Sequence, residues 1–190
     1  MATNVLVERE TITAETNPRV LALDELAQEL TNGAFAQARA KLAHRDRGLD
    51  AAALLSRPDF LASLKSELAS GLAAALADND RRVRAVYTYD PALNADSEDG
   101  VELSPDLTLH LIVRVDSGSA ALEAFLAALD RALVEALQKL APPLFAQRSS
   151  WINATLITDR DVRLGQGAAR LLSAVFTPPI QVWDCEAQAS

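Results

Sequence analysis

The sequence predicts an α+β protein with a mixed sheet of about four strands, helices packed on that sheet and an N-terminal helical extension. Two observations lead to this prediction. From Pro58 onward the hydrophobic pattern changes in the order helix, strand, strand, helix, strand, helix, strand. The first two of these strands are neighbours along the chain, whereas the third is reached through a helix. Such an order places antiparallel and parallel pairs in one sheet.

The residues before Pro58 are predicted to form an arm and a helical extension. Residues 1–20 are rich in Thr and Glu, and we interpret them as a mobile arm or a short edge strand. Residues 21–57 form the extension. Its first helix, LALDELAQEL, is expected to end at Asn32 and Gly33, and a second follows over AFAQARAKLAHR. A third, short helix ends before Pro58, because the residue before a proline disfavours the helical conformation.

Residues 58–190 are predicted to form the α/β domain. It opens with a helix over residues 58–77, whose leucines recur at i, i+3, i+4 spacing. The stretch VRAVYTY is expected to be a largely buried strand, because both of its faces are partly apolar. DLTLHLIVRV alternates apolar and polar residues throughout, and is the clearest strand of the chain.

The second half of this domain contains a crossover helix and two more strands. A long amphipathic helix is expected to begin at Ser117-Gly118-Ser119, with one of the two serines as its N-cap, and to end at Pro142-Pro143, since proline interrupts a helix. WINATLITD is the third predicted strand. LGQGAARLLSAVF follows as a short helix, and PIQVWD as the last strand.

The composition limits the partners that we expect. The chain has 190 residues, is 49% hydrophobic and carries a formal net charge of −8, which is typical of one folded domain. We expect no nucleic-acid partner, because affinity for a phosphate backbone comes from clustered Lys and Arg. The densest basic cluster, formed by Arg81, Arg82 and Arg84, is interpreted as an exposed junction between a helix and a strand.

The cysteine content and the hydrophobic pattern indicate the compartment. A single cysteine, Cys185, excludes an intramolecular disulfide and a zinc site built from cysteines. The N-terminal residues do not show the pattern of a signal peptide, and no apolar run approaches the roughly 20 residues that cross a bilayer. We therefore expect a cytoplasmic protein without a membrane partner. A protein partner or a homodimer remains open.

The order of the elements, together with certain residues, resembles the nucleotidyltransferase superfamily of DNA polymerase β-like folds. In that family a helix leads to a strand that ends in Gly-Ser, a second strand opens with Asp-x-Asp, and a third adds another carboxylate. AALADNDRRVRAVYTYDP is similar to the first helix and strand, and SPDLTLHLIVRVD to the second strand. WINATLITDRDV occupies the place of the third strand, and LLSAVFTPPIQVWD is similar to the closing helix and strand. The resemblance covers residues 58–184.

The chain departs from the family where the family keeps its chemistry. Asp90-Pro91 replaces Gly-Ser. A proline has no N–H to donate to a phosphate, and an aspartate repels one. Asp106 matches the first acid of Asp-x-Asp, but Thr108 replaces the second, so a divalent cation loses one of two carboxylates on the same side of a strand. Asn153 stands where the third strand would carry an acid. The resemblance implies the fold and argues against metal-dependent nucleotidyl transfer.

The candidate ligand-facing residues are Asp90, Asp106, Thr108, His110 and Asn153. Three of them, Asp106, Thr108 and His110, share the polar face of one strand with Arg114. An acid, a hydroxyl, an imidazole and a guanidinium on one face could bind a small anion or transfer a proton. The alternative is that this face is the solvated side of a half-covered sheet. Asp106 is the candidate metal ligand, together with acids of the link between Asp90 and Asp106. The alternative interpretation of these acids is an exposed hairpin that keeps a sheet edge soluble.

Three functions are compatible with these residues. The first is a catalytically degenerate nucleotidyltransferase-like protein that acts as a binding or regulatory module. The second is an interaction or dimerisation protein that uses its N-terminal helices. The third is an active nucleotidyltransferase with a diverged carboxylate set, and only this one requires Mg²⁺ and a nucleotide.

Overall fold

The computed structural model describes residues 18–46, 48–89, 108–142, 149–175 and 178–187. The helices are α1 (Pro18–Ala40), α2 (Ala51–Leu55), α3 (Pro58–Asn79), α5 (Ala120–Leu140) and α7 (Asp159–Leu164), with 3₁₀ turns η1 (His44–Asp46) and η2 (Gly167–Ser173). The strands are β1 (Val83–Tyr89), β2 (Leu109–Val115), β3 (Ile152–Thr158) and β4 (Ile180–Asp184). The predicted α+β class is confirmed.

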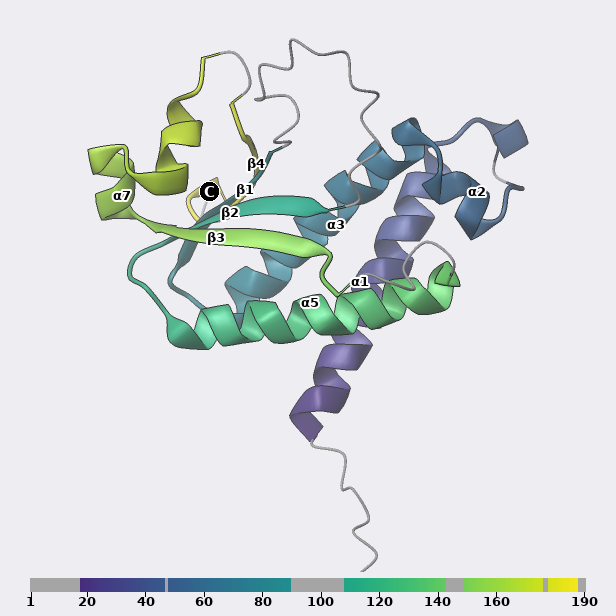
Figure 1. Ribbon diagram of the computed structural model, residues 1–190, viewed down its shortest axis with the longest axis horizontal. Helices are drawn as coiled ribbons and strands as arrows, with labels where there is room; N and C mark the ends of the chain where they lie inside the picture. The colour runs from purple at the N-terminus through teal and green to yellow at the C-terminus, as the bar shows by residue number, and fades with distance from the viewer. Residues whose placement is uncertain (1–17, 47, 90–107, 143–148, 176–177, 188–190) are drawn as a thin grey trace, which may run out of the picture.

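The four strands form one mixed sheet in the order β3-β2-β1-β4 (Figure 1). β1 is antiparallel to both of its neighbours, β2 and β4. β2 and β3 are parallel and are joined through α5, as the predicted crossover requires. The register shifts between Val83 and Ala85 toward β2, where Arg84 of β1 is the extra residue, and between Val86 and Tyr87 toward β4, where Val182 of β4 is the extra residue. β1 and β4 therefore each carry one irregularity of the kind a β-bulge produces.

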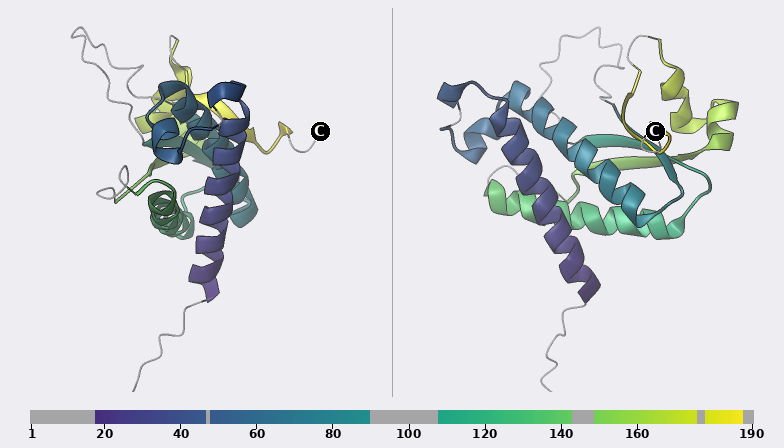
Figure 2. Two further views of the ribbon diagram at one scale, coloured as in Figure 1. Left: turned by 90° about the vertical axis from the view of Figure 1, so that its right-hand side faces the viewer. Right: turned by 180° about the vertical axis from the view of Figure 1, so that it is seen from behind.

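One face of the sheet carries the main core. Leu109, Leu111, Val113 and Val115 of β2 point to this face and are almost fully buried. α3 and α5 cover it, and α1 crosses on the outer side of these two helices (Figures 1 and 2). Residues of all three helices belong to the same buried apolar cluster as the β2 residues. The alternation of β2 follows from this arrangement, since its odd-numbered residues face the helices.

α1 corrects the predicted helix break at Asn32 and Gly33, because it runs unbroken from Pro18 to Ala40. Gly33 is exposed, whereas Ala27, Ala34 and Ala38 on either side of it are buried. Burial of one continuous stripe outweighs the cost of about 1 kcal/mol for a glycine inside a helix. α1 therefore shares the core of the sheet, while the domain boundaries at residues 20 and 57 remain predictions and residues 1–17 lie outside the described part.

A smaller cluster lies on the opposite face of the sheet. Ile112 of β2, Ile157 of β3 and Ala169 of η2 are buried there, with α7 and η2 packed over the strands. α7 was not predicted, and the expected helix over LGQGAARLLSAVF is the 3₁₀ turn η2. Gly165 and Gly167 adopt φ of 57° and 54°, which favours glycine and separates the two short elements.

α3 is long and apolar enough, by length and composition alone, to cross a membrane, and it is the one such helix in the described ranges. In this structure Phe60, Leu64, Leu68 and Leu72 of α3 are fully buried in the main cluster. A helix in the core of a protein is expected to be this apolar.

Candidate functional site

The described candidate residues meet at one end of the sheet, where β1 ends and β2 and β3 begin. Tyr89 of β1 is opposite His110 of β2, and His110 is opposite Asn153 of β3. Thr108 directly precedes β2. Because residues in register across neighbouring strands project to the same face, Tyr89, His110 and Asn153 form a row on the face opposite α3 and α5. We call these three residues the sheet-end row.

The sheet-end row combines two rings and an amide. The rings of Tyr89 and His110 have centroids 5.4 Å apart and are tilted by 51°. Tyr89 and His110 are half-buried and Asn153 is exposed. The Thr88 hydroxyl donates a hydrogen bond to the His110 carbonyl oxygen at 3.3 Å and joins the two strands there. Aromatic faces beside an exposed amide are suited to a planar polar ligand, since the rings stack and the amide both donates and accepts hydrogen bonds.

Asp90 and Asp106 lie outside the described residues, and their assignment to this site remains a prediction. Asp90 follows Tyr89 directly in the sequence, and Asp106 is two residues before Thr108. Among the described residues, no group of three or more His, Cys, Asp or Glu side chains could hold a metal ion. The candidate metal ligand Asp106 is not among the residues to which this finding applies.

A second polar site lies at the opposite end of the sheet, where β2, β3 and β4 terminate. A cavity of about 310 Å³ opens there, lined by Arg84, Arg114, Asp116, Asp159, Asp184, Cys185 and Glu186. Arg114 Nε donates to Asp159 Oδ1 at 2.7 Å, and the Arg84 guanidinium pairs with the Asp116 carboxylate. Each arginine is thus held by a carboxylate that follows a strand.

The charges of this cavity are arranged for structure more than for binding an anion. The guanidinium of Arg84 lowers the pKa of Asp116, and the carboxylate of Asp159 raises the pKa of Arg114. Acidic side chains outnumber the arginines among the lining residues. Exposed pairs of this kind contribute little to stability, because water screens the charges. We therefore assign the cluster a role in joining the strand ends.

The basic cluster of the sequence lies at the junction between α3 and β1, as predicted. Arg82 Nη2 contacts Asp80 Oδ2 at 2.7 Å and Ser119 Oγ at 2.5 Å, and Arg84 pairs with Asp116. Hydrogen bonds from Arg82 lower the pKa of Asp80 to about 2. Arg81 is exposed and forms no ion pair with a described residue. Two of the three arginine charges in the cluster are thus paired with nearby carboxylates.

The sequence interpretation missed Tyr89 and the carboxylates of the second polar site. Arg114 stood out on a polar strand face, but its partner Asp159 is 45 residues away. The predicted crossover could have indicated this pairing. In a parallel pair of strands, the residues that follow the two strands lie at the same edge of the sheet. Tyr89 could be placed beside His110 only once the antiparallel register was known.

Comparisons with known proteins identify no relative. No model of a protein family matches the sequence, and neither a characterised protein nor a solved structure is significantly similar to it. The resemblance to nucleotidyltransferases therefore remains a prediction from the order of the elements and the residues given above.

Proposed function

We propose that this chain is a binding module with a nucleotidyltransferase-like architecture that performs no nucleotidyl transfer, and that it binds a nucleotide at the sheet-end row. The observation that supports the proposal is the register that aligns Tyr89, His110 and Asn153 across three strands. This end of the sheet is where the resembling family keeps its chemistry.

The side chains of the row match the chemistry of a nucleobase. A base can stack on the ring of Tyr89 or His110, and such stacking contributes about 1–3 kcal/mol per base. The exposed Asn153 amide offers a donor and an acceptor to the polar edge of a base. Thr108 supplies a neutral hydroxyl where the family has a second metal-binding acid, so a divalent cation is held less firmly. These side chains therefore favour binding of a nucleotide without nucleotidyl transfer.

Isothermal titration with ATP and with CTP, each with and without Mg²⁺, tests the proposal. We expect saturable binding by the wild-type chain and an affinity about tenfold weaker or more for Tyr89→Ala and Asn153→Ala, corresponding to the loss of stacking or of the amide. Gln37→Ala, an exposed position on α1, is the matched control and should bind as the wild type does. Absence of heat with every nucleotide would remove the proposal.

The active-enzyme alternative has its own test. It requires Asp106 and Asp90 to serve as a diverged carboxylate set with Mg²⁺ and a nucleotide as cofactors. Asp106→Asn should then abolish a measurable turnover of nucleoside triphosphate while the far-ultraviolet circular dichroism stays unchanged. A wild-type chain without turnover rejects this alternative.

A second candidate function, interaction through the N-terminal helices, is favoured by one observation. The N-terminal half of α1 extends past α5 (Figures 1 and 2). Beside it lies a cavity of about 840 Å³, lined by Ala22, Leu23, Leu26, Asn79, Asp80, Arg81, Arg82, Ala121, Ala124 and Phe125. Half-buried apolar side chains next to an exposed arginine are suited to a partner helix with an acidic residue.

Light scattering on the full chain tests this second candidate. If α1 mediates self-association, the wild-type mass should exceed that of one chain, and Leu23→Glu with Leu26→Glu should reduce it to one chain. Both side chains are only partly buried, so the variant is expected to fold. An unchanged mass in this variant argues against the α1 surface.

A further inference from the structure

β3 is an edge strand of the described sheet, and half of its backbone groups point away from β2. The Leu109 N–H donates to the Trp151 carbonyl at 2.8 Å, so the carbonyl of residue 151 faces β2. In a parallel pair the groups that face the neighbour belong to alternate residues. The N–H and C=O groups of the even-numbered residues, 152, 154, 156 and 158, therefore point outward.

The outward groups at the two ends of β3 already have partners inside the chain. The Ile152 N–H donates to Asp130 Oδ1 at 2.7 Å, and the Ile152 carbonyl accepts from the Ser150 hydroxyl at 3.1 Å. The Thr158 N–H donates to Asp161 Oδ2 at 2.8 Å, within the capping box of α7. Within the part of the chain that the structure describes, the N–H and C=O groups of Ala154 and Leu156 have no hydrogen-bond partner.

We propose that this edge pairs with the β3 edge of a second copy of the chain, antiparallel and around a two-fold axis at Thr155. Ala154 of one copy then faces Leu156 of the other, and each such pair exchanges two backbone hydrogen bonds. The two pairs together use all four unpartnered groups of each edge. A strip that is complementary to itself in this way fits an isologous dimer, and the pairing removes an exposed edge from each copy.

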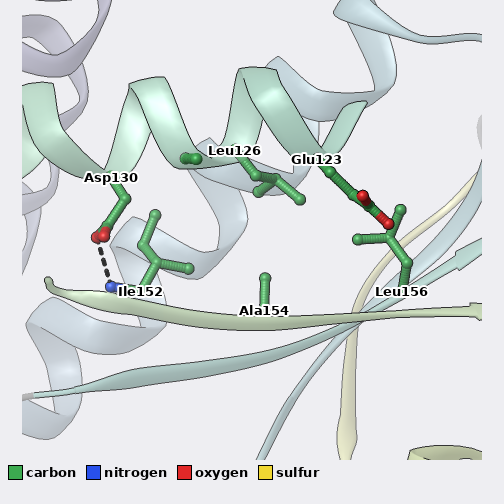
Figure 3. A pocket seen from close by; sticks show the side chains of 7 residues that line it. Glu123, Leu126, Asp130, Ile152, Ala154 and Leu156 are labelled. Atoms are coloured by element: carbon green, nitrogen blue, oxygen red, sulfur yellow. Dashed lines mark hydrogen bonds between the residues drawn. The ribbon is translucent and has the colours of Figure 1, made fainter. Parts of the chain in front are cut away.

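The side chains beside this edge also favour pairing with a second copy of the chain. A hollow of about 250 Å³ lies between β3 and α5, and Leu126, Ala154 and Leu156 point into it (Figure 3). Two-fold pairing sets the small Ala154 of one copy beside the larger Leu156 of the other, which extends the apolar contact across the axis. The other lining residues of the hollow are Glu123, Ala127, Asp130 and Ile152.

A charge-swap experiment at the axis tests the dimer. Thr155 is half-buried on the face away from α5, and across the axis it would meet its own copy at a Cα separation of about 4.5 Å. Thr155→Lys and Thr155→Glu should each be monomeric, because like charges then face one another. An equimolar mixture of the two variants should restore the dimer, as measured by sedimentation velocity over a series of concentrations. Gln181→Lys and Gln181→Glu, exposed on the other edge strand β4, are matched controls and should remain dimeric.

Amide hydrogen exchange provides a readout that needs no variant. If the proposal holds, the amides of Ala154 and Leu156 in the wild-type chain become more protected as the concentration rises, while those of β4 do not. A wild-type chain that is monomeric at every concentration overturns the proposal. If both Thr155 variants remain dimeric, the proposal is also overturned, and the dimer forms through another surface, such as that of α1.

Discussion

The carboxylate of Asp130 on α5 accepts the backbone N–H of Ile152 at the start of β3, with 2.7 Å between Oδ1 and N. The same oxygen accepts the N–H of Trp151 at 2.8 Å. A side chain in the middle of the crossover helix thus fixes where the third strand begins, since these two N–H groups are bound to α5 and not to another strand. Figure 3 shows the carboxylate directed at this strand end.

Asp130→Ala should destabilise the fold. The substitution leaves two partly buried N–H groups without their acceptor, and an unsatisfied buried donor costs about 1–3 kcal/mol. We expect the midpoint of urea unfolding to fall accordingly. Asp130→Asn keeps an acceptor oxygen and should lose less, whereas equal stability of the alanine variant and the wild type would contradict this role.

Asp80 should make stability depend on pH in the acid range. The hydrogen bonds from Arg82 lower the pKa of Asp80 to about 2 in the folded chain, against an unfolded value of ~3.9. A carboxylate whose pKa is lower in the folded chain than in the unfolded chain stabilises the fold. This stabilisation is fully present when the pH is above the unfolded pKa, and it is lost as the pH falls through the folded pKa. The free energy of unfolding of the wild type should exceed that of Asp80→Asn by about 1–2 kcal/mol near pH 7.

This difference should shrink between about pH 4 and pH 2, as Asp80 becomes protonated in the unfolded and then in the folded chain. Urea unfolding at a series of pH values measures it. Asp78→Asn, which removes an exposed carboxylate from the same end of α3, is the matched control for net charge. A difference that is the same at pH 7 and at pH 2 would show that the Arg82 pair contributes nothing.

Thr31→Val should stabilise the protein. Thr31 is fully buried within α1, and its hydroxyl has no hydrogen-bond partner among the described residues. Valine replaces the hydroxyl by a methyl group of similar shape, which removes the desolvation cost of the polar group, about 1 kcal/mol. Differential scanning calorimetry should show a higher Tm. Thr31→Ser keeps the hydroxyl and deletes the methyl, so a Tm below that of the wild type is expected for it.

Ser119→Ala should weaken the start of α5. The Ser119 hydroxyl accepts the Leu122 N–H at 3.1 Å as the N-cap, and it also accepts a hydrogen bond from Arg82. Loss of an N-cap costs about 0.5–2 kcal/mol. Ser117→Ala, two residues earlier and exposed, controls for removal of a hydroxyl. Equal unfolding free energies for the two variants would argue against the capping role.

The sequence was informative where one periodicity continued through an element. The alternation of β2, the leucine stripe of α3 and a serine cap at the start of α5 were each predicted and are present in the structure, because local pattern and burial agree there. Prediction failed at Asn32 and Gly33, where packing against α3 and α5 overrides a local stop signal. The partners of the second polar site could not be predicted, because their contacts depend on which strand ends meet. For the sheet-end row, the sequence identified His110 and Asn153 but not Tyr89.

β4 lies at one edge of the sheet and pairs with β1, which is far earlier in the chain. Pairing between such distant segments closes a long loop, so β4 is expected to dock late in folding and to detach at a lower free energy than the central strands. The single thiol of the chain, Cys185, directly follows β4 and is half-buried, and its backbone N–H still bonds to the Arg84 carbonyl at 2.9 Å. The natural sequence thus carries its own probe, because the rate at which a thiol reagent modifies Cys185 reports how often this strand detaches.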